Sequence, residues 1–350
     1  MKIFHLLIVA SGIVLLGLLV YGIGPQPLWQ ELSLLGWGLV MLVLLEGVSN
    51  LFHAKGWKYC LSDSHRDVSF GRLFCVQMAG GSINYLTPTA GLGGDVAKGL
   101  LLASNRRGHQ AASSVILDKL SYALAQLVLI AGGCCLLLPK FAMSRALWLA
   151  LIPVTCVLGG GIFGFLIVQR CGKLGSIVRW AAGHRLGGAS LARIAGSMTQ
   201  VDEELQRFYQ RRPGDFVMSV ICHFAGLLWG AVPAFYFLVL ARGSASLAAA
   251  SAITVLGNWF DILAFAIPAD IGVQEATRVV AFRILGFSAA LGLTYAITRR
   301  MQQMFWAAVG LILYGLLATS RIRPYPLGGE PKGETDRKRE RAYATTERAE

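Results

Sequence analysis

The stretch Asn84-Tyr-Leu-Thr-Pro-Thr-Ala-Gly-Leu-Gly-Gly-Asp-Val-Ala-Lys98 lies within an apolar region of the chain, yet it is rich in residues that break helices. Pro88 lacks a backbone donor, and the glycines that follow it tolerate backbone angles that other residues avoid. Asp95 and Lys98 then place a carboxylate and an amine on one face of a new helix. Irregular backbone at membrane depth is tolerated only inside protein or around a wet cavity, and ionisable groups there indicate function. The stretch therefore predicts a functional site, against the alternative of a polar loop outside the bilayer.

A related stretch, Ile267 to Arg278, follows 180 residues later and predicts an internal repeat. Four positions match at this one offset: Pro88 with Pro268, Asp95 with Glu275, Lys98 with Arg278, and Lys119 with Arg299. The first copy covers about residues 73–139 and the second about 245–319.

Composition indicates an integral membrane protein. The 350 residues are 55% hydrophobic and 15% charged, with a mean hydropathy of +0.57. The basic residues behind the net charge of +13 lie in loops between apolar runs. They therefore indicate which loops are cytoplasmic and suggest contact with anionic lipid. We expect no nucleic-acid partner. The seven cysteines form no CxxC pair and are expected to be packing residues, so the sequence predicts no metal and no cofactor.

Hydropathy predicts an all-α polytopic protein with six full spans. They are Phe4–Gly24, Ser33–His53, Gln110–Pro139, Arg145–Gln169, Asp215–Leu240 and Ser288–Ser320. The excess of Lys and Arg in alternate loops predicts that both termini and the connector Arg170–Gly214 are cytoplasmic, in an inner (plasma) membrane. Residues 1–320 form the transmembrane domain, and we expect residues 321–350 to be a disordered cytoplasmic tail.

Two regions are too short to cross the bilayer twice, and we predict that each forms a re-entrant helical hairpin. The first runs from Leu73 to Leu86, breaks at Pro88 and continues to about Ser104; the second joins Ala245–Ile267 to Gln274–Leu285. The hairpins should open to opposite sides, with their prolines meeting near mid-membrane, which is the inverted-repeat pattern of many secondary transporters. The alternative is one full span plus a surface helix in either region.

The connector Arg170–Gly214 carries eight basic residues. Apolar spacing around residues 174–181 predicts an amphipathic helix on the inner leaflet, with a second helix around Met198–Tyr209. A solvated cytoplasmic connector is the alternative.

Ten charged residues fall in or near apolar segments, five acids and five bases. Internal salt bridges account for some of them, but so many buried charges favour a polar cavity for a charged headgroup. The candidate substrate-binding residues are Asn84, Pro88, Asp95, Lys98, Asp118, Lys119, Pro268, Glu275, Arg278, Arg299 and Arg300, and Glu46 and Asp261 complete the set of charges. His223 has no partner near it in the sequence and is expected to be a hydrogen-bonded core histidine.

These motifs resemble the lysylphosphatidylglycerol synthase transmembrane family of flippase-like membrane proteins. The resemblance covers about Ser33 to Ser320 and rests on Asn84, Thr87-Pro88, Gly93-Gly94-Asp95, Lys98, Asp118-Lys119, Pro268, Gly272-Val-Gln-Glu275 and Arg299-Arg300. The stretches ending at Glu275 and Arg300 are similar to a hopanoid-biosynthesis-associated branch, although Ala269-Asp270 replaces a Gly-rich segment. The resemblance implies lipid flipping; the short tail leaves no room for the family's aminoacyl-transferase domain, so aminoacylation is not expected.

The sequence thus predicts a transporter that moves an anionic-headgroup lipid, or a polyprenyl- or hopanoid-related lipid, by alternating access. A non-transporting subunit that docks a lipid-modifying enzyme or glycosyltransferase is the alternative. A membrane-embedded enzyme is less favoured, because the chain has no Walker A loop and no metal-ligand cluster. A lipid-biosynthesis enzyme and a second copy of the chain are both open as partners.

We predict that the cysteine introduced by Arg106→Cys is labelled from the cytoplasmic side. The basic stretch Asn105-Arg106-Arg107 follows the first hairpin, and basic loops lie in the cytoplasm. Impermeant maleimide on intact cells should leave it unmodified, and it should react in inverted vesicles. Labelling from outside would contradict a first hairpin that opens to the cytoplasm.

Overall fold

The computed structural model describes residues 33, 35–87, 92–103, 108–141, 144–184, 188–264 and 273–320, which form helices and no strands. The helices before the long connector are α3 (Trp37–Cys60), α4 (Phe70–Leu86), α5 (Leu92–Leu102), α6 (Gly108–Gly132) and α7 (Arg145–Arg170). A π turn and a 3-10 turn extend α6 to Lys140. The connector forms α8 (Leu174–Gly183) and α9 (Gly188–Arg211). The remaining helices are α10 (Pro213–Trp229), α11 (Ala231–Arg242), α12 (Leu247–Ala264), α13 (Val273–Ile284) and α14 (Ala289–Ser320).

Five of the predicted spans correspond to helical segments that are long and apolar enough to cross a membrane. These segments are Trp37–Cys60, Gly108–Lys140, Leu147–Arg170, Pro213–Arg242 and Ala289–Thr319. The span predicted over Asp215–Leu240 is two helices, α10 and α11, joined at Gly230. The predicted first span Phe4–Gly24, both hairpin prolines and the tail 321–350 lie outside the described residues.

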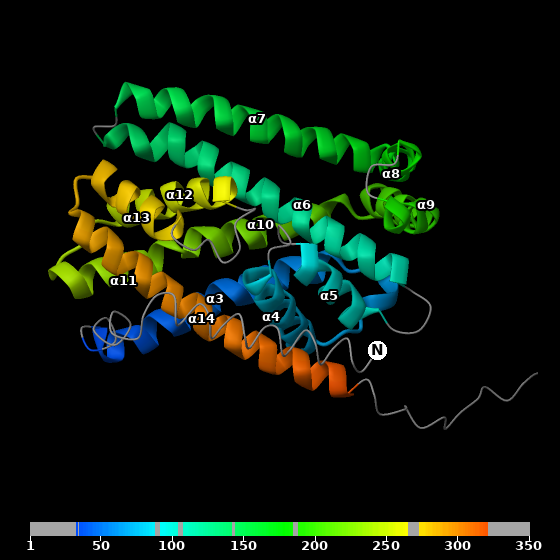
Figure 1. Ribbon diagram of the computed structural model, residues 1–350, viewed down its shortest axis with the longest axis horizontal. Helices are drawn as coiled ribbons and strands as arrows, with labels where there is room; N and C mark the ends of the chain where they lie inside the picture. The colour runs from blue at the N-terminus through cyan, green and yellow to red at the C-terminus, as the bar shows by residue number, and fades with distance from the viewer. Residues whose placement is uncertain are drawn as a thin grey trace, which may run out of the picture.

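Short helix pairs stand where the sequence predicts hairpins. In Figure 1 the pair α4 and α5 lies toward the end of the bundle that carries α8, α9 and the C-terminal end of α14. The pair α12 and α13 lies at the opposite end, beside α11 and the start of α14. The two short pairs therefore occupy opposite ends of the long bundle.

The helix boundaries also repeat along the chain. Among the described residues, α4, α5 and α6 cover 70–86, 92–102 and 108–132; adding 180 gives 250–266, 272–282 and 288–312. Helices α12, α13 and α14 cover 247–264, 273–284 and 289–320, so each overlaps its counterpart over most of its length. The offset that relates the two motifs therefore also relates the helices that carry them.

Close backbone packing joins α4 to α5. A Cβ atom on Gly94 would collide with the carbonyl oxygen of Gly80 and with the Asn84 side chain. The Asn84 amide oxygen accepts the N–H of Gly94 at 2.6 Å, which satisfies a donor in the first turn of α5. The Asn84 amide nitrogen donates to Asp95 at 3.4 Å. Asn84, in the last turn of α4, therefore caps the first turn of α5 and contacts its carboxylate.

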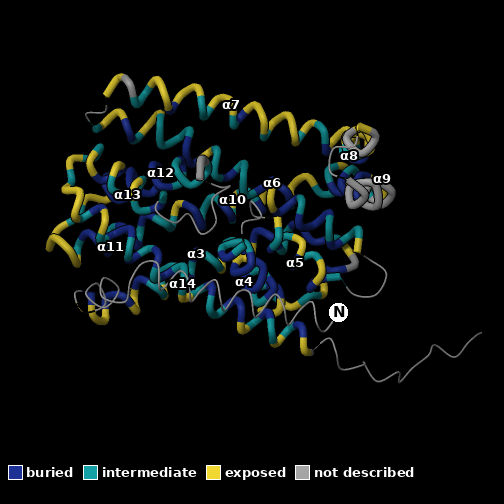
Figure 2. The backbone as a smooth tube through the Cα atoms, viewed as in Figure 1, coloured by how far each residue is buried: buried dark blue, intermediate teal, exposed yellow. Residues whose placement is uncertain are grey.

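The periphery of the bundle differs from its interior. Helix α7 lies at one edge, and Figure 2 shows exposed residues along it; Leu149, Val157 and Phe163 are exposed apolar side chains on this helix. The predicted helix over 174–181 is α8, whose Ile177 and Trp180 are exposed. Asp202 of α9 accepts the N–H groups of Leu174 and Gly175 and so caps α8. The predicted helix over 198–209 is part of the longer α9.

Replacing Gly94 tests the packing of α4 on α5. Gly94→Ala should lower the free energy of unfolding by about 1–3 kcal/mol, because the new methyl group overlaps backbone that cannot move away cheaply. Gly99→Ala is the matched control in the same helix: nothing lies within 4 Å of its added Cβ, so helix propensity should leave stability unchanged or slightly raised. Thermal unfolding in detergent measures both. Equal midpoints for the two variants would contradict the close contact.

Candidate functional site

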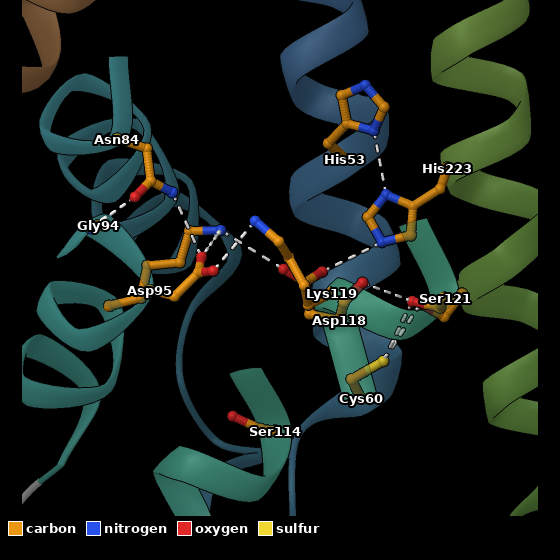
Figure 3. A network of polar contacts seen from close by, with 12 residues as sticks. His53, Cys60, Asn84, Gly94, Asp95, Ser114, Asp118, Lys119, Ser121 and His223 are labelled. Atoms are coloured by element: carbon orange, nitrogen blue, oxygen red, sulfur yellow. Dashed lines mark hydrogen bonds and ion pairs between the residues drawn. The ribbon is translucent and has the colours of Figure 1, made fainter. Parts of the chain in front are cut away.

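Four charged side chains, Asp95, Lys98, Asp118 and Lys119, form one group that we call the hairpin cluster (Figure 3). The Lys98 ammonium lies 3.5 Å from an oxygen of Asp118 and 3.8 Å from an oxygen of Asp95. The Lys119 ammonium lies 3.1 Å from the other oxygen of Asp95. Lys98 and Asp118 are only 6% and 5% exposed, whereas the Lys119 side chain is half exposed. Two carboxylates therefore balance two ammonium groups.

The Lys98 side chain is held in place along its whole length. Its stem packs against Gly80 of α4, where a Cβ atom would overlap it. Its ammonium lies 5.4 Å from the ring centroid of Trp57, a side chain with no exposed surface. A cation over an aromatic face gains electrostatic stabilisation when both groups are desolvated. Helices α3, α4 and α6 thus all contribute to the position of this one amine.

A second group of charges surrounds a polar cavity of about 220 Å³ between α3, α6, α10, α12, α13 and α14. Its charged lining consists of Glu46, Asp261, Arg278 and Arg299. Arg278 donates to both oxygens of Asp261 at 2.8 Å and to the carbonyl oxygen of Gly257 at 3.2 Å. Arg299 donates to both oxygens of Glu46, at 2.5 and 3.4 Å. The cavity therefore also carries two acids and two bases.

The third group is the pair Glu275 and Arg300. Two nitrogens of the Arg300 guanidinium donate to the two carboxylate oxygens, at 2.6 and 3.0 Å. Arg300 is 1% exposed. This fork-to-fork contact ties α13 to α14, next to the polar cavity but outside its charged lining.

The structure brings the predicted site residues into these three groups. Asn84, Asp95, Lys98, Asp118 and Lys119 meet around the first hairpin. Arg278 and Arg299 line the cavity, while Glu275 and Arg300 pair with each other. Pro88 and Pro268 lie outside the described residues.

The equal spacing of acid and base in the two motifs leads to different contacts. Asp95 and Lys98 lie within 3.8 Å, as their spacing on one helix face predicts. In the second motif the partner of Glu275 is Arg300, and the partner of Arg278 is Asp261. Arg300 reaches Glu275 with two nitrogens, and Arg278 reaches both oxygens of Asp261 with one. Each of these arginines therefore pairs with an acid of a neighbouring helix.

His223 has hydrogen-bonding partners on other helices, although none lies near it in the sequence. One ring nitrogen, Nε2, lies 3.1 Å from an oxygen of Asp118, and Nδ1 lies 3.0 Å from Nδ1 of His53. Tyr122 meets both imidazole rings edge-on, with ring centroids 5.2 and 5.6 Å away. The expectation of a hydrogen-bonded core histidine is confirmed, and the pair connects the hairpin cluster to the cavity, because His53 lines it.

Four residues of this arrangement are absent from the binding residues that the sequence predicts. Glu46 and Asp261 are among the ten charges of the apolar segments but do not belong to either repeated motif. His53 and His223 are 170 residues apart, and neither belongs to a motif. Glu46 and Asp261 could have been found because a buried cation needs a carboxylate partner. No comparable signal in the sequence pointed to the histidines.

Comparison with known proteins gives one family. The family model described as "Lysylphosphatidylglycerol synthase TM region" matches residues 3–310. No curated protein and no solved structure matches the chain significantly. The matched range includes both motifs, both short helix pairs and all residues of the three charged groups.

Asp118→Asn tests the charge balance of the hairpin cluster. It should lower the free energy of unfolding by about 3–5 kcal/mol, because Lys98 keeps only its longer contact with Asp95. Adding Lys98→Met should recover part of the loss. Glu203→Gln is the control: it removes an exposed pair with Arg207 and should change stability by less than about 1 kcal/mol. Thermal unfolding in detergent is the measurement, and an unchanged midpoint for Asp118→Asn would contradict the balance.

Proposed function

Because the chain belongs to the lysylphosphatidylglycerol synthase transmembrane family, we propose that it moves a lipid with an anionic headgroup across the membrane. The observation that carries the proposal is the polar cavity, in which two guanidinium groups face a space of about 220 Å³ deep among apolar helices. The hopanoid-associated branch stays a prediction, since the family match is silent on it.

The contacts of the two arginines suit a headgroup phosphate. Planar guanidinium groups can bind phosphate through two parallel hydrogen bonds, and Arg299 binds the carboxylate of Glu46 with two nitrogens in this way. Arg278 donates to both oxygens of Asp261 from one nitrogen. An entering phosphate competes with these carboxylates for the same donors. When no phosphate is bound, the carboxylates stay paired with the arginines, which avoids the cost of an uncompensated buried charge.

A second hollow of mixed polar and apolar lining adjoins the cavity and suits the rest of a lipid. It has a volume of about 170 Å³ and shares Glu46 and Gln303 with the polar cavity. Met78, Trp306 and Ala307 supply apolar lining. A ligand with a charged end and an apolar body fits two adjoining spaces of this character, whereas a small polar solute uses only one.

Alternating access is the mechanism we infer. The two helix pairs lie at opposite ends of the bundle, and the 180-residue offset relates their helices, which supports an inverted repeat with two re-entrant hairpins. Exchange of conformation between the halves would open the cavity to each side in turn. The basic connector and the C-terminal end of α14 share one end of the bundle, which supports cytoplasmic placement of that end in the inner membrane.

Transport in liposomes tests this function. The purified protein should move fluorescent phosphatidylglycerol between leaflets faster than empty liposomes do. The charge-balanced double variant Glu46→Gln/Arg299→Gln should slow this movement about 10- to 100-fold, because a charge-assisted bond contributes about 1.5–3 kcal/mol. Arg283→Gln, an exposed arginine on α13, is the control and should match the unmutated rate.

Two results would count against the proposal. No movement above empty liposomes would favour the docking subunit, in which the connector α8–α9 binds a partner enzyme. Unchanged movement in the folded double variant would show that the headgroup does not use the cavity.

A further inference from the structure

A chain of hydrogen bonds runs from the polar cavity to the hairpin cluster through the two histidines (Figure 3). It begins at the hydroxyl of Ser49, 3.3 Å from Nε2 of His53. It continues through the two Nδ1 atoms, 3.0 Å apart, and ends where Nε2 of His223 meets Asp118. Ser49 and His53 line the cavity, while Asp118 holds Lys98.

Both ends of this chain accept hydrogen bonds. At one end, Asp118 accepts from Lys98 on one carboxylate oxygen, and as a carboxylate it has only acceptors to offer His223 on the other. Nε2 of His223 must therefore carry a proton. At the other end, Ser49 donates its single hydroxyl proton to the carbonyl oxygen of Gly226 at 2.9 Å. Nε2 of His53 must therefore also carry a proton in order to donate to Ser49.

If all of these contacts form at once, the number of protons on the four ring nitrogens follows. Two are needed at the outer nitrogens, and the contact between the Nδ1 atoms needs a third, because two bare nitrogens facing each other at 3.0 Å repel. Two neutral imidazoles carry only two ring protons. The complete chain of contacts therefore holds one proton more than a carboxylate and two neutral histidines would supply.

Loss of that proton has a structural consequence. With two neutral rings, the Ser49 hydroxyl must turn from Gly226 toward Nε2 of His53 to keep the chain connected. The carbonyl oxygen of Gly226 then loses this partner in the last turn of α10, where helix carbonyls lack partners of their own. Gly226 and Gly230 both line the cavity, and Gly230 separates α10 from α11. Proton binding is thus linked to the junction of these helices beside the site.

The charges around the histidines also favour a proton when an anion is present. Asp118 and Tyr122 of α6 contact the histidines directly. Lys98 pairs with Asp118, and Cys60 of α3 bonds Ser121 and Ser219 nearby. The charged groups that line the cavity together with His53 are Glu46, Asp261, Arg278 and Arg299. The four cavity charges cancel, and so do the four charges of the hairpin cluster. A phosphodiester headgroup adds one negative charge to this neutral surrounding. A proton on the pair, at the cavity wall, compensates it.

We propose that the Asp118–His223–His53 chain is the binding site of a coupling proton, taken up together with one anionic headgroup. This inference rests on the proposed lipid function, and it names the ion that accompanies the lipid. Histidine suits the task because its charge changes within the physiological pH range. No bond other than the N–H bond forms or breaks. The histidine pair takes up the proton from one side of the membrane and releases it to the other side together with the headgroup.

The first experiment measures the proton without any lipid. Nitrogen-15 spectra of histidine-labelled protein distinguish protonated from bare ring nitrogens, and His53→Gln and His223→Gln assign the signals. At acidic pH the pair should show three protonated nitrogens, with one lost from both rings together as the pH rises. Two protonated nitrogens at every pH at which the protein stays folded would overturn the proton site.

The second experiment measures linkage to the headgroup. Binding of dihexanoylphosphatidylglycerol should weaken as pH rises, by up to about tenfold per pH unit, since the lipid binds with a proton. His223→Gln should bind it with the same affinity at each pH, and His184→Gln, an exposed histidine at the end of α8, should behave as the unmutated protein. Dihexanoylphosphatidylcholine, which has no net charge, should show no linkage.

The two experiments separate two failures. If the unmutated protein binds phosphatidylglycerol equally well at every pH, the coupling of proton and headgroup binding is overturned and the lipid function stands. A third ring proton in the spectra, with no binding of phosphatidylglycerol at any pH, would overturn the lipid function and leave the proton site standing.

Discussion

Neutralisation of buried cations is the constraint on which the rest of this structure depends. Lys98, Arg278 and Arg300 are almost completely buried, and each has a carboxylate within 3.5 Å. In each case the closest acid comes from a different helix: α6 holds α5, α12 holds α13, and α13 holds α14. Removing one partner of such a pair costs about 3–5 kcal/mol, which is a large part of a protein's stability. The ion pairs therefore fix which helices are neighbours, in an interior where apolar packing alone distinguishes them poorly.

Close packing of glycines lets the short helices bring these charges together. Gly80 and Gly94 allow α4 and α5 to approach until the Lys98 stem lies across the first helix. Arg278 of α13 lies across Gly257 of α12 in a similar way, donating to its carbonyl oxygen. In both pairs a long basic side chain replaces the side chain that the glycine lacks. Backbone proximity and charge placement thus have the same cause.

The sequence predicted the helices well and their contacts less well, for a physical reason. Apolar length sets a span, so the five described spans and the short helix pairs follow from hydropathy. The inverted repeat stays a prediction. Ion pairing depends on which side chain of another helix reaches a donor in the right plane. Spacing along one helix therefore anticipated Asp95 with Lys98 but not Glu275 with Arg300. The contact between His53 and His223 depends only on how α3 packs against α10, which no local pattern encodes.

The two halves use different cations at matching positions, and this difference bears on how a headgroup could pass between them. Lys98 and Lys119 are compact charges paired with carboxylates of the hairpin cluster, while the matching Arg278 and Arg299 are planar guanidinium groups that pair with acids and line the polar cavity. Both groups are neutral, so in the proposed mechanism an anion and a proton that move together between them leave no net charge behind. The histidine pair contacts Asp118 of the hairpin cluster at one end and lines the polar cavity at the other. The proposed proton on the pair would compensate an anion on either side, which follows from the same charge balance that holds the helices together.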